Sequence, residues 1–447
     1  MITLQERVHA APKPDDWQLD KMHQVFRVRR GHKNAGMKED NLLSLSYGRI
    51  IQKDIDTADG LLPENFEGYQ IVEPGNIVLR LTDLQNDKRS LRQGLVTQRG
   101  IITSAYDAVE VQRDNDPRFW FYSLLALDLA KHYYSLGGGV RQSVKFADFP
   151  NDWVYRPDLA TQRQIADFLD RETARLDLLI EKKQRFASGV EDEFLDRVSH
   201  LVTLGANEGT PRKQSGYAWH PTVPVNWTVT RLKFLCSRIV DCLHETPEHL
   251  EDGEYPSIRT SDLTRGSVDI GSAKRVSADE YQHRIQRLEP KEDDILYTRE
   301  GERFGLAAMV PPETKLCLGQ RMMMFRTNGR VLPAYLMWSL NGKFAYNFLK
   351  QDVTGATSPH LNIFDIRNVP VFLPPIDEQS ALVTEIDAFF EKKSQLVEKT
   401  LATMDRLKEY RSALITSAVT GQIDVTTYAK SGTPDRRLDA IQEEMGA

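Results

Sequence analysis

Long apolar runs and paired cysteines are both missing from this sequence of 447 residues, and each absence narrows what the chain can be. No apolar stretch approaches the roughly 20 residues that a membrane-spanning helix needs. Segment 1–17 is charged throughout and lacks the apolar core of a signal peptide. The three cysteines, Cys236, Cys242 and Cys317, form no CxxC pattern, which argues against a disulfide framework and a zinc site. We therefore expect a cytoplasmic protein that does not enter a membrane.

Sequence motifs of the common enzyme classes are missing as well. There is no G-x-S-x-G and no H-E-x-x-H, and segment 31–38 lacks the adjacent Gly-Lys-Ser/Thr of a phosphate loop. His244 and His249 lie near Cys242, but their spacing fits no common metal site and favours solvated loop residues. Segment 310–313 (VPPE) lacks the leading Asn/Asp and the aromatic residue of a methyltransferase motif. We therefore predict no catalytic residue, no metal site and no cofactor bound by this chain itself.

The sequence also has no excess of basic residues. It carries 58 Lys and Arg against 64 Asp and Glu, a formal net charge of −6, so overall charge gives no sign of nucleic-acid binding. With 40% hydrophobic and 27% charged residues, it has the composition of a soluble globular protein. Its length permits about two to four domains, each large enough to bury its own core.

What the sequence does contain is an internal repeat. Segment 156–162 (RPDLATQ) aligns with 373–379 (LPPIDEQ), and segment 138–155 just upstream aligns with 355–372 at the same offset. Earlier in each copy, a Glu-Pro pair precedes two apolar residues, at 73–78 and again at 289–296. Because the order of these features is kept, we predict that the chain is built twice on one plan.

Each copy is predicted to have two parts. The first is rich in Gly, Pro and turn signals, with short β-like runs that are typical of a mixed domain. The second is a long helix, for which Asp158 and Asp377 are available as N-caps. The predicted fold class is α+β, with two mixed α/β domains separated by a pair of long helices. The predicted boundaries are 1–155 (first domain), 156–205 (first helix), 206–216 (linker), 217–372 (second domain), 373–428 (second helix) and 429–447 (loose tail).

Apolar residues recur in both predicted helices at steps that suit a coiled coil. In the first helix they run from Ile165 through Phe186 to Leu201, and in the second they include Phe389 and Leu396. Such a seam predicts helices about 60 Å long that pack against each other as an antiparallel coiled coil. The alternative is that each helix lies on its own domain.

Taken together, these features resemble the specificity (S) subunit of type I restriction-modification systems, in which a target-recognition domain alternates twice with a long helix. In that family the helix opens with a Pro-x-x-x-Glu-Gln signature. Segment 374–379 (PPIDEQ) matches this signature, whereas Thr161 replaces the glutamate in the first copy. Segment 412–423 (SALITSAVTGQI) is similar to the family's second-helix ending, and segment 241–247 (DCLHETP) to the opening of its second domain.

The resemblance implies a non-enzymatic role. An S subunit holds two methyltransferase (M) subunits and, in the restricting complex, translocase-nuclease (R) subunits. Each recognition domain reads one half of a split, asymmetric target in double-stranded DNA, and the helices set the spacing and dock the M subunits. S-adenosylmethionine is then expected on the M subunits, and ATP and Mg on the R subunits, with no cofactor in this chain.

Side chains that can pair with base edges or phosphates supply the candidate DNA contacts. They gather in loops of both domains, and the loops after Gly138 and Gly355 occupy matching positions of the repeat. The candidates are Arg27, Arg30, Lys88, Arg89, Arg92, Arg141, Gln142, Ser143, His244, Arg259, Thr260, Arg299, Arg303, Thr357, Ser358, His360 and Asn362. The candidate partner-binding residues, at the helix entrances, are Gln162, Ile165, Leu169, Glu378, Gln379, Leu382 and Ile386.

Two other interpretations stay open at this point. One is a DNA-targeting or scaffold subunit of another phage-defence complex that uses the same architecture without methylation. The other is a nuclease or methyltransferase whose site has no recognisable motif, and the missing motifs argue against it.

Overall fold

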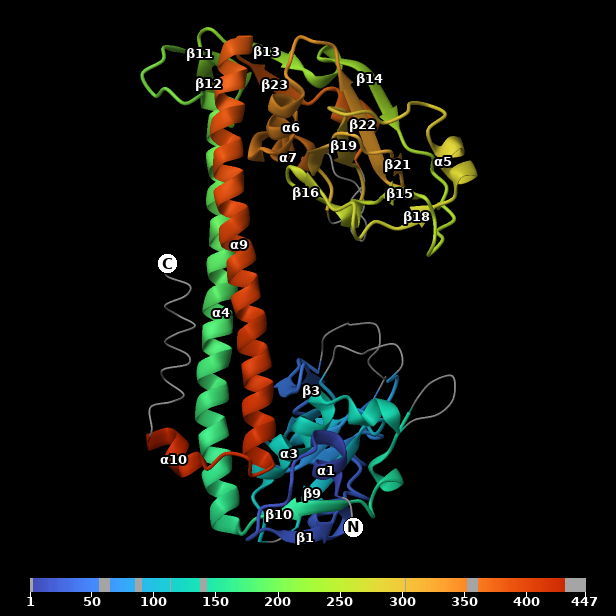
Figure 1. The fold of residues 1–447 in the computed structure, drawn as a ribbon, viewed down its shortest axis with the longest axis vertical. Coiled ribbons are helices and arrows are strands. Elements are labelled where there is room, and N and C mark those ends of the chain that lie inside the picture. The colour runs from blue at the N-terminus through green and yellow to red at the C-terminus, as the bar shows by residue number, and fades with distance from the viewer. Residues whose placement is uncertain are drawn as a thin grey trace. The chain divides into compact units, whose positions relative to one another are not determined.

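The computed structural model describes residues 3–55, 65–84, 91–112, 114–136, 143–301, 303–351 and 361–430. The chain divides into two compact units: unit 1 comprises Met1–Gln184 and Lys399–Ala447, and unit 2 comprises Arg185–Glu398. Each unit contains one mixed domain and part of each of two long helices, α4 (Leu159–Leu204) and α9 (Ile376–Val419) (Figure 1). The chain therefore passes from one unit to the other within these helices.

The domain of unit 1 is built on a four-stranded antiparallel sheet with the strand order β2-β9-β6-β7. Two smaller strand pairs and the strand pair β1–β10 surround it. The strands are β1 (Gln18–Lys21), β2 (Phe26–Val28), β3 (Leu43–Ser46), β4 (Arg49–Gln52), β5 (Gln70–Val72), β6 (Ile77–Leu79), β7 (Gln93–Leu95), β8 (Gly100–Ile102), β9 (Asp107–Val111) and β10 (Trp153–Arg156). The helices are α1 (Leu4–His9), α2 (Met22–Val25) and α3 (Pro117–Leu129), with α10 (Val425–Lys430) after α9.

The domain of unit 2 repeats this plan with the strand order β14-β22-β19-β20. Its main strands are β13 (Thr228–Arg231), β14 (Cys236–Asp241), β19 (Ile295–Thr298), β20 (Ala307–Met309), β22 (Met322–Thr327) and β23 (Pro370–Leu373). The smaller strands are β11 (Arg212–Tyr217), β12 (His220–Pro224), β15 (Tyr255–Ile258), β16 (Leu263–Thr264), β17 (Ser267–Val268), β18 (Arg275–Val276) and β21 (Cys317–Leu318). The helices are α5 (Ala278–Arg284), α6 (Pro333–Asn341), α7 (Lys343–Lys350) and α8 (Ile363–Arg367).

The strand orders confirm the internal repeat. Strands β2, β9, β6 and β7 of the first domain correspond in order and direction to β14, β22, β19 and β20 of the second. In both copies the strand that opens the domain pairs with the strand that leads into the long helix, β1 with β10 and β13 with β23. The segment 206–216, which was predicted as a linker, already contains the first residues of β11.

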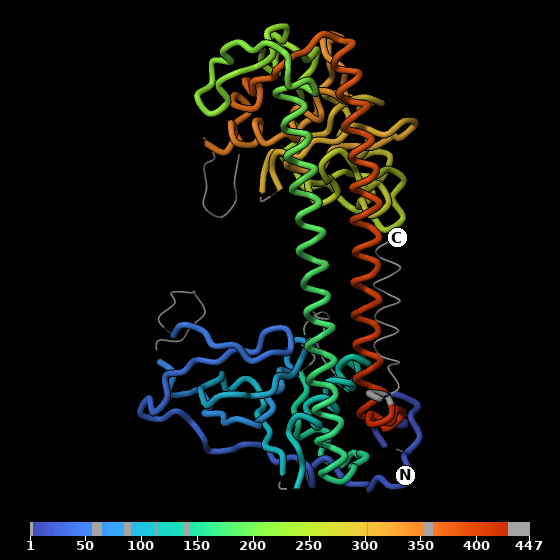
Figure 2. Tube along the Cα trace, turned by 90° about the vertical axis from the view of Figure 1, so that its left-hand side faces the viewer, coloured from blue at the N-terminus to red at the C-terminus, as the bar shows by residue number. Residues whose placement is uncertain are grey.

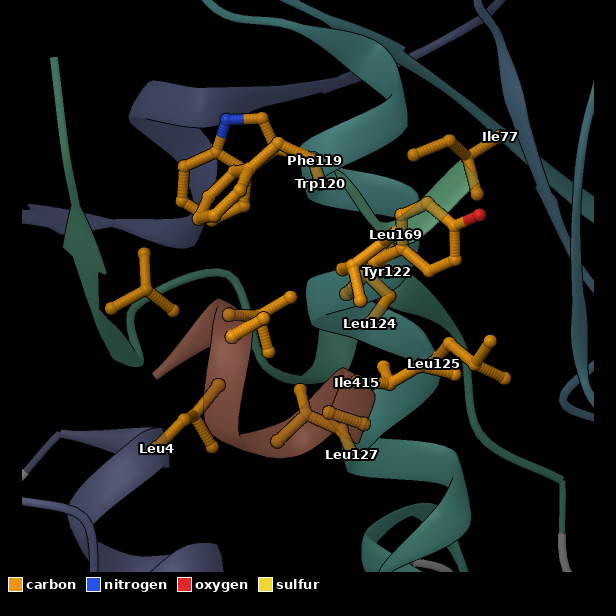
Figure 3. Close-up of a cluster of buried hydrophobic side chains, with 14 of the residues drawn as sticks. Leu4, Ile77, Phe119, Trp120, Tyr122, Leu124, Leu125, Leu127, Leu169 and Ile415 are labelled. Carbon is orange, nitrogen blue, oxygen red and sulfur yellow. The ribbon is translucent and has the colours of Figure 1, made fainter. Parts of the chain in front are cut away.

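The core of unit 1 gathers around α3. This helix is apolar on nearly all sides, so it is buried rather than amphipathic. Figure 3 shows Trp120 and Leu124 of α3 in one cluster with Leu4 of α1, Leu169 of α4 and Ile415 of α9. Since each fully buried apolar side chain contributes about 1.5–3 kcal/mol, this cluster fixes both long helices to the first domain.

The two long helices run antiparallel within each unit (Figure 2). In unit 1, Arg411 of α9 binds Asp177 of α4, with Nε 2.8 Å from Oδ1. In unit 2, Lys393 binds Glu191 at 3.1 Å, and Arg197, further along α4, binds Glu385, earlier in α9. The α+β fold class with an antiparallel helix pair is thereby confirmed. With 46 and 44 residues, the helices are each close to 70 Å long at a rise of about 1.5 Å per residue.

The seam of the helix pair differs in part from the predicted one. Phe186, Phe389 and Leu396 were placed in it, but their exposed fractions are 47%, 42% and 39%. On α4 the neighbouring Ala187 is buried instead. A straight helix has 3.6 residues per turn and drifts away from a seven-residue repeat, so the buried stripe shifts to the next residue.

The two helix entrances are capped differently. Asp158 accepts bonds from the backbone N–H groups of Ala160 (2.8 Å) and Thr161 (3.0 Å), which confirms its predicted role as N-cap of α4. The same prediction for Asp377 is wrong. Because the N–H of Gln379 already donates to the carbonyl of Pro375, α9 begins at Ile376 and Asp377 lies within its first turn.

Within the described ranges, every helix is too short or too polar to span a lipid bilayer.

Candidate nucleic-acid interface

In each domain, three strands of the four-stranded sheet terminate side by side, and we call this place the strand-end edge. In the first domain β2 and β6 end here and β9 begins, with Leu79 opposite Asp107 in the register. In the second domain β14 and β19 end here and β22 begins, with Thr298 opposite Met322. The repeat therefore presents the same sheet edge twice.

Equivalent backbone hydrogen bonds align the two edges. The N–H after the end of β2, from Arg29, donates to the carbonyl of Ala108 (2.9 Å), as that of Cys242 does to Met322 (3.0 Å). A further backbone bond follows each predicted contact loop, although the two acceptors do not match in the strand register: Val144 donates to Leu81 (2.8 Å), and Leu361 donates to Arg299 (3.3 Å). The described chain thus rejoins both sheets at this edge immediately after the predicted loops.

Several predicted contact residues lie outside the described residues. They are Lys88, Arg89, Arg141, Gln142, Thr357, Ser358 and His360.

In the first domain, Arg27 and Arg30 are exposed at the end of β2, and Ser143 is exposed as well. Arg92 is placed differently, because its side chain is 0% exposed. Its guanidinium donates to the hydroxyl of Tyr134 and to the carbonyl of Thr82, both at 3.2 Å. This arginine therefore holds the domain interior together, and we do not carry it into the proposed interface.

In the second domain, the edge carries a network of charged side chains. Arg299 is buried and places its Nη1 2.7 Å from Oδ2 of Asp241 and its Nε 3.1 Å from Oε1 of Glu300. His244, which is exposed, contacts the same oxygen of Asp241 at 2.9 Å. Arg321 lies 3.7 Å from Glu300 at the outer end of the network. Sequence reasoning named Arg299 and His244 but did not predict the pairing of Arg299 with Asp241, because these two residues are far apart in the chain.

The other candidates of the second domain surround this edge. Arg259 forms an ion pair with the buried Asp262 at 2.7 Å, next to the half-buried Thr260. Arg303 is exposed and donates to the carbonyl of Ser261 at 3.1 Å. Asn362 caps α8, accepting a bond from the N–H of Phe364 at 2.9 Å.

Two exposed aromatic side chains escaped the sequence analysis. Tyr47 is 79% exposed and occupies the turn between β3 and β4 with a positive φ of 46°. Phe364 is 68% exposed in α8, which follows the second predicted contact loop. The Tyr-Gly pair between two alternating strands was the available signal for the first, whereas no local pattern indicates the second.

The predicted partner-binding residues at the helix entrances are mostly buried in their own unit. Ile165, Leu169, Leu382 and Ile386 are at most 2% exposed. Glu378 accepts bonds from Trp227 Nε1 and from the amide of Asn226, both at 3.0 Å. These side chains hold each long helix on the adjoining domain, so a partner would meet their exposed neighbours rather than the residues themselves.

Gln162 and Gln379 make the same contacts in the two repeats. Oε1 of Gln162 accepts the backbone N–H of Asp116, and Oε1 of Gln379 accepts that of Leu332, both at 2.8 Å. Each Nε2 donates to the carbonyl of the proline at its helix entrance, at 2.9 Å in both copies. Asp116 and Leu332 are the N-caps of α3 and α6. Each glutamine therefore joins the start of a long helix to the start of a domain helix.

Replacing Gln162 by leucine should destabilise unit 1 by about 2–5 kcal/mol. The change leaves the N–H of Asp116 and the carbonyl of Pro157 buried without a partner, and each such group costs about 1–3 kcal/mol. Urea unfolding of the full chain measures the effect. Gln164→Leu is the matched control, because Gln164 is exposed on the same helix. An equal loss of stability in both variants would contradict this role of Gln162.

The cysteines are poor candidates for chemistry. Burial raises the pKa of Cys236 to about 12 and that of Cys317 to about 11, and it raises the pKa of Cys242 as well. These thiols therefore stay protonated near neutral pH, whereas the thiolate is the form that attacks or binds metals. Among the described residues, no group of three or more His, Cys, Asp or Glu side chains is arranged to hold a metal ion.

Comparison with known proteins gives consistent results. A family model described as "Type I restriction modification DNA specificity domain" matches residues 224–405, which cover the second repeat. The chain is 21% identical over 342 residues to the type I restriction enzyme EcoBI specificity subunit of Escherichia coli, a match that spans 73% of this chain and 70% of that protein. It is also 21% identical over 444 residues to the MjaVIII specificity subunit of Methanocaldococcus jannaschii, spanning 94% of this chain and 96% of that protein.

The fold has a solved counterpart as well. A chain from a structure concerned with complex assembly and conformational transition of the type I restriction-modification system superposes with a TM-score of 0.62 at 15% identity. The superposition covers 92% of this chain and all of that chain. The family match, the relatives and the duplicated fold agree with the resemblance seen in the sequence: the chain is similar to type I restriction-modification specificity subunits.

Proposed function

We propose that this chain is the DNA-reading subunit of a type I restriction-modification complex, and that each domain recognises one half of a split, asymmetric target. The observation that carries the proposal is the duplicated strand-end edge. The edges have the same strand order and aligned backbone bonds but different side chains. Two copies of one scaffold with different surface residues are suited to reading two different short sequences.

The side chains at the edges have the chemistry that base and phosphate contacts need. Exposed arginines such as Arg27, Arg30 and Arg303 can pair with guanine or with phosphate oxygens. In the second domain, His244 is exposed while Asp241 fixes its ring. Arg299 forms ion pairs with Asp241 and Glu300 at the described edge of that domain. We therefore expect direct base contacts there to come from side chains that these three residues hold in place.

We further propose that α4 and α9 set the gap between the half-sites and dock two methyltransferase subunits. Exposed apolar residues along the helices support a protein-binding role: Leu178 is 50%, Leu401 46% and Ile376 47% exposed. The chain itself would be non-catalytic, with S-adenosylmethionine bound by the methyltransferase subunits and ATP and Mg by the restriction subunits. On this view the isolated chain binds DNA weakly, because partner subunits supply much of the attraction to phosphates.

Lengthening both helices by seven residues should lengthen the gap in the DNA target. Insertions after Gln184 and after Glu398, where the units divide, keep the seven-residue seam in register and add about 10 Å. At about 3.4 Å per base pair, the preferred gap should grow by about three base pairs. The measurement is the methylation pattern of cells that carry the variant with its methyltransferase subunits.

A variant in which the same seven residues replace existing ones, without a change of length, is the control. It should keep the original gap. If the lengthened chain also methylates only the original gap, the helices do not set the spacing.

A further inference from the structure

A basic cleft opens beside β2, the edge strand of the first domain's main sheet. It encloses about 660 Å³, and its floor includes the buried ring of Phe26. Three arginines from the end of β2 and the residues just after it, Arg27, Arg29 and Arg30, line it together with His32. The cleft therefore concentrates positive charge in a chain whose overall charge is negative.

The charge of this cleft is left largely uncompensated. Among the described residues, none of the three arginines forms an ion pair, and Nε of Arg29 is buried without a hydrogen-bond partner. Glu110 lines the cleft and stands opposite Arg27 in the strand register, but the two form no ion pair in this part of the chain. Unpaired guanidinium groups around a concave surface are suited to an anion with several oxygen acceptors.

The described positions of the second domain that match these three arginines carry no positive charge. The matching backbone bonds of Arg29 and Cys242 at the two strand-end edges fix which residues correspond. The residues at the positions of Arg27, Arg29 and Arg30 are Val240, Cys242 and Leu243. Near the second edge, Arg259 and Arg299 are paired with carboxylates, and Arg303 donates to the carbonyl of Ser261. Among the described residues, the three arginines of the basic cleft are thus not repeated at the matching positions of the second domain.

We propose that the basic cleft grips the phosphodiester backbone of the DNA next to the half-site that the first domain reads. This inference rests on the proposed function and adds an asymmetry to it: the first domain supplies more of the phosphate binding than the second. Contacts between guanidinium groups and phosphates release counterions and carry no sequence information. The cleft then sets affinity and its salt dependence, while the target sequence is set elsewhere.

The test measures how DNA affinity depends on salt. The complex of the full chain with its methyltransferase subunits is titrated with a target duplex between about 50 and 200 mM salt. Each lost phosphate contact lowers the slope of log affinity against log salt by about 0.9. For the double variant Arg27→Gln/Arg30→Gln, the fourfold rise in salt should therefore weaken binding about tenfold less than for the unchanged complex.

Arg99→Gln is the control for the double variant. It removes one positive charge from the same domain, but Arg99 already pairs with Glu39 (3.0 Å) and Glu73 (2.6 Å). Its slope should stay unchanged, and so should the DNA sequence that every variant methylates. Because Arg27 and Arg30 are exposed, the melting temperature of the double variant should match that of the unchanged chain.

Duplexes with neutral methylphosphonates identify the source of the phosphate. Placed beside the first domain's half-site, they should lower the slope of the unchanged complex to that of the double variant. Placed beside the other half-site, they should preserve the difference in salt slope between the unchanged complex and the double variant.

A double variant whose salt slope equals that of the unchanged complex would overturn the proposed role of the cleft. A second outcome would also overturn it: the double variant keeps the DNA salt slope but is no longer stabilised against heat by inorganic phosphate. That result would mean that the cleft binds a free anion. In both cases methylation of a split target would still support the proposed function. Absence of any specific target would overturn both proposals together.

Discussion

Exchanging residues 17–150 for the corresponding domain of another specificity subunit should change one half of the methylated DNA target and leave the other half as it was. The reason is the repeat itself, because each domain has its own sheet and its own core. At least two base pairs of the original half-site would then be mismatched, each at a cost of about 1–3 kcal/mol. Methylation of the original target should fall by roughly 30-fold or more.

The structure suggests better boundaries for this exchange. Residues 17 and 150 separate β1 from its partner β10, whose register joins Gln18 to Arg156. An exchange of residues 22–152 keeps this strand pair from one parent and should give a more stable chimera. The reciprocal exchange of residues 232–369, which lie between β13 and β23, should change the other half-site only. A change in both halves after either exchange would contradict the modular account.

Replacing Arg299 by methionine should destabilise unit 2 by about 3–5 kcal/mol. The side chains of Arg299, Asp241 and Glu300 are 4%, 12% and 18% exposed, so the change leaves two carboxylates in a largely dry site without their cation. Removing one partner of a buried ion pair costs about this much. Denaturant unfolding should show the loss, and the half-site read by the second domain should no longer be methylated efficiently.

Arg321→Met is the control for this prediction. Arg321 contacts the same Glu300, but it is 54% exposed and 3.7 Å away, so its loss should cost less than about 1 kcal/mol. A triple variant, Arg299→Met with Asp241→Asn and Glu300→Gln, should recover much of the lost stability if unpaired charge is the cause. An equal loss of stability in Arg299→Met and Arg321→Met would show that the contribution of these ion pairs to stability does not depend on their burial.

Features that are local in the chain could be predicted from the sequence. The helix entrances follow from Pro157 and Asp158 and from 374–379, and the repeat follows from segments that match at a fixed offset. The prediction of Asp377 as the N-cap of α9 was wrong because two prolines precede this helix, and the carbonyl of Pro375 already accepts the first helical bond. The prediction that Phe186 lies in the seam was wrong because this residue is one position outside a narrow buried stripe. These errors are shifts of one or two residues, which a periodic pattern cannot resolve.

The candidate site could be predicted only in part, because it depends on contacts between distant segments. Arg92 has the sequence surroundings of a surface arginine, yet Tyr134 and Thr82 enclose it. Asp241 meets Arg299 only because β14 and β19 both pair with β22. The basic cleft was visible as an arginine cluster at 27–30, but its concave shape, and the absence of ion pairs to these arginines among the described residues, come from the fold.

The central claim is that this chain directs methylation to one split DNA sequence, and a single-molecule methylome of cells with and without its gene tests it most directly. The account predicts that one motif, made of two short half-sites around an unspecified gap, loses its methylation when the gene is removed and regains it when the gene is restored. An identical methylome in both strains, with the partner methyltransferase shown to be expressed, would contradict the account.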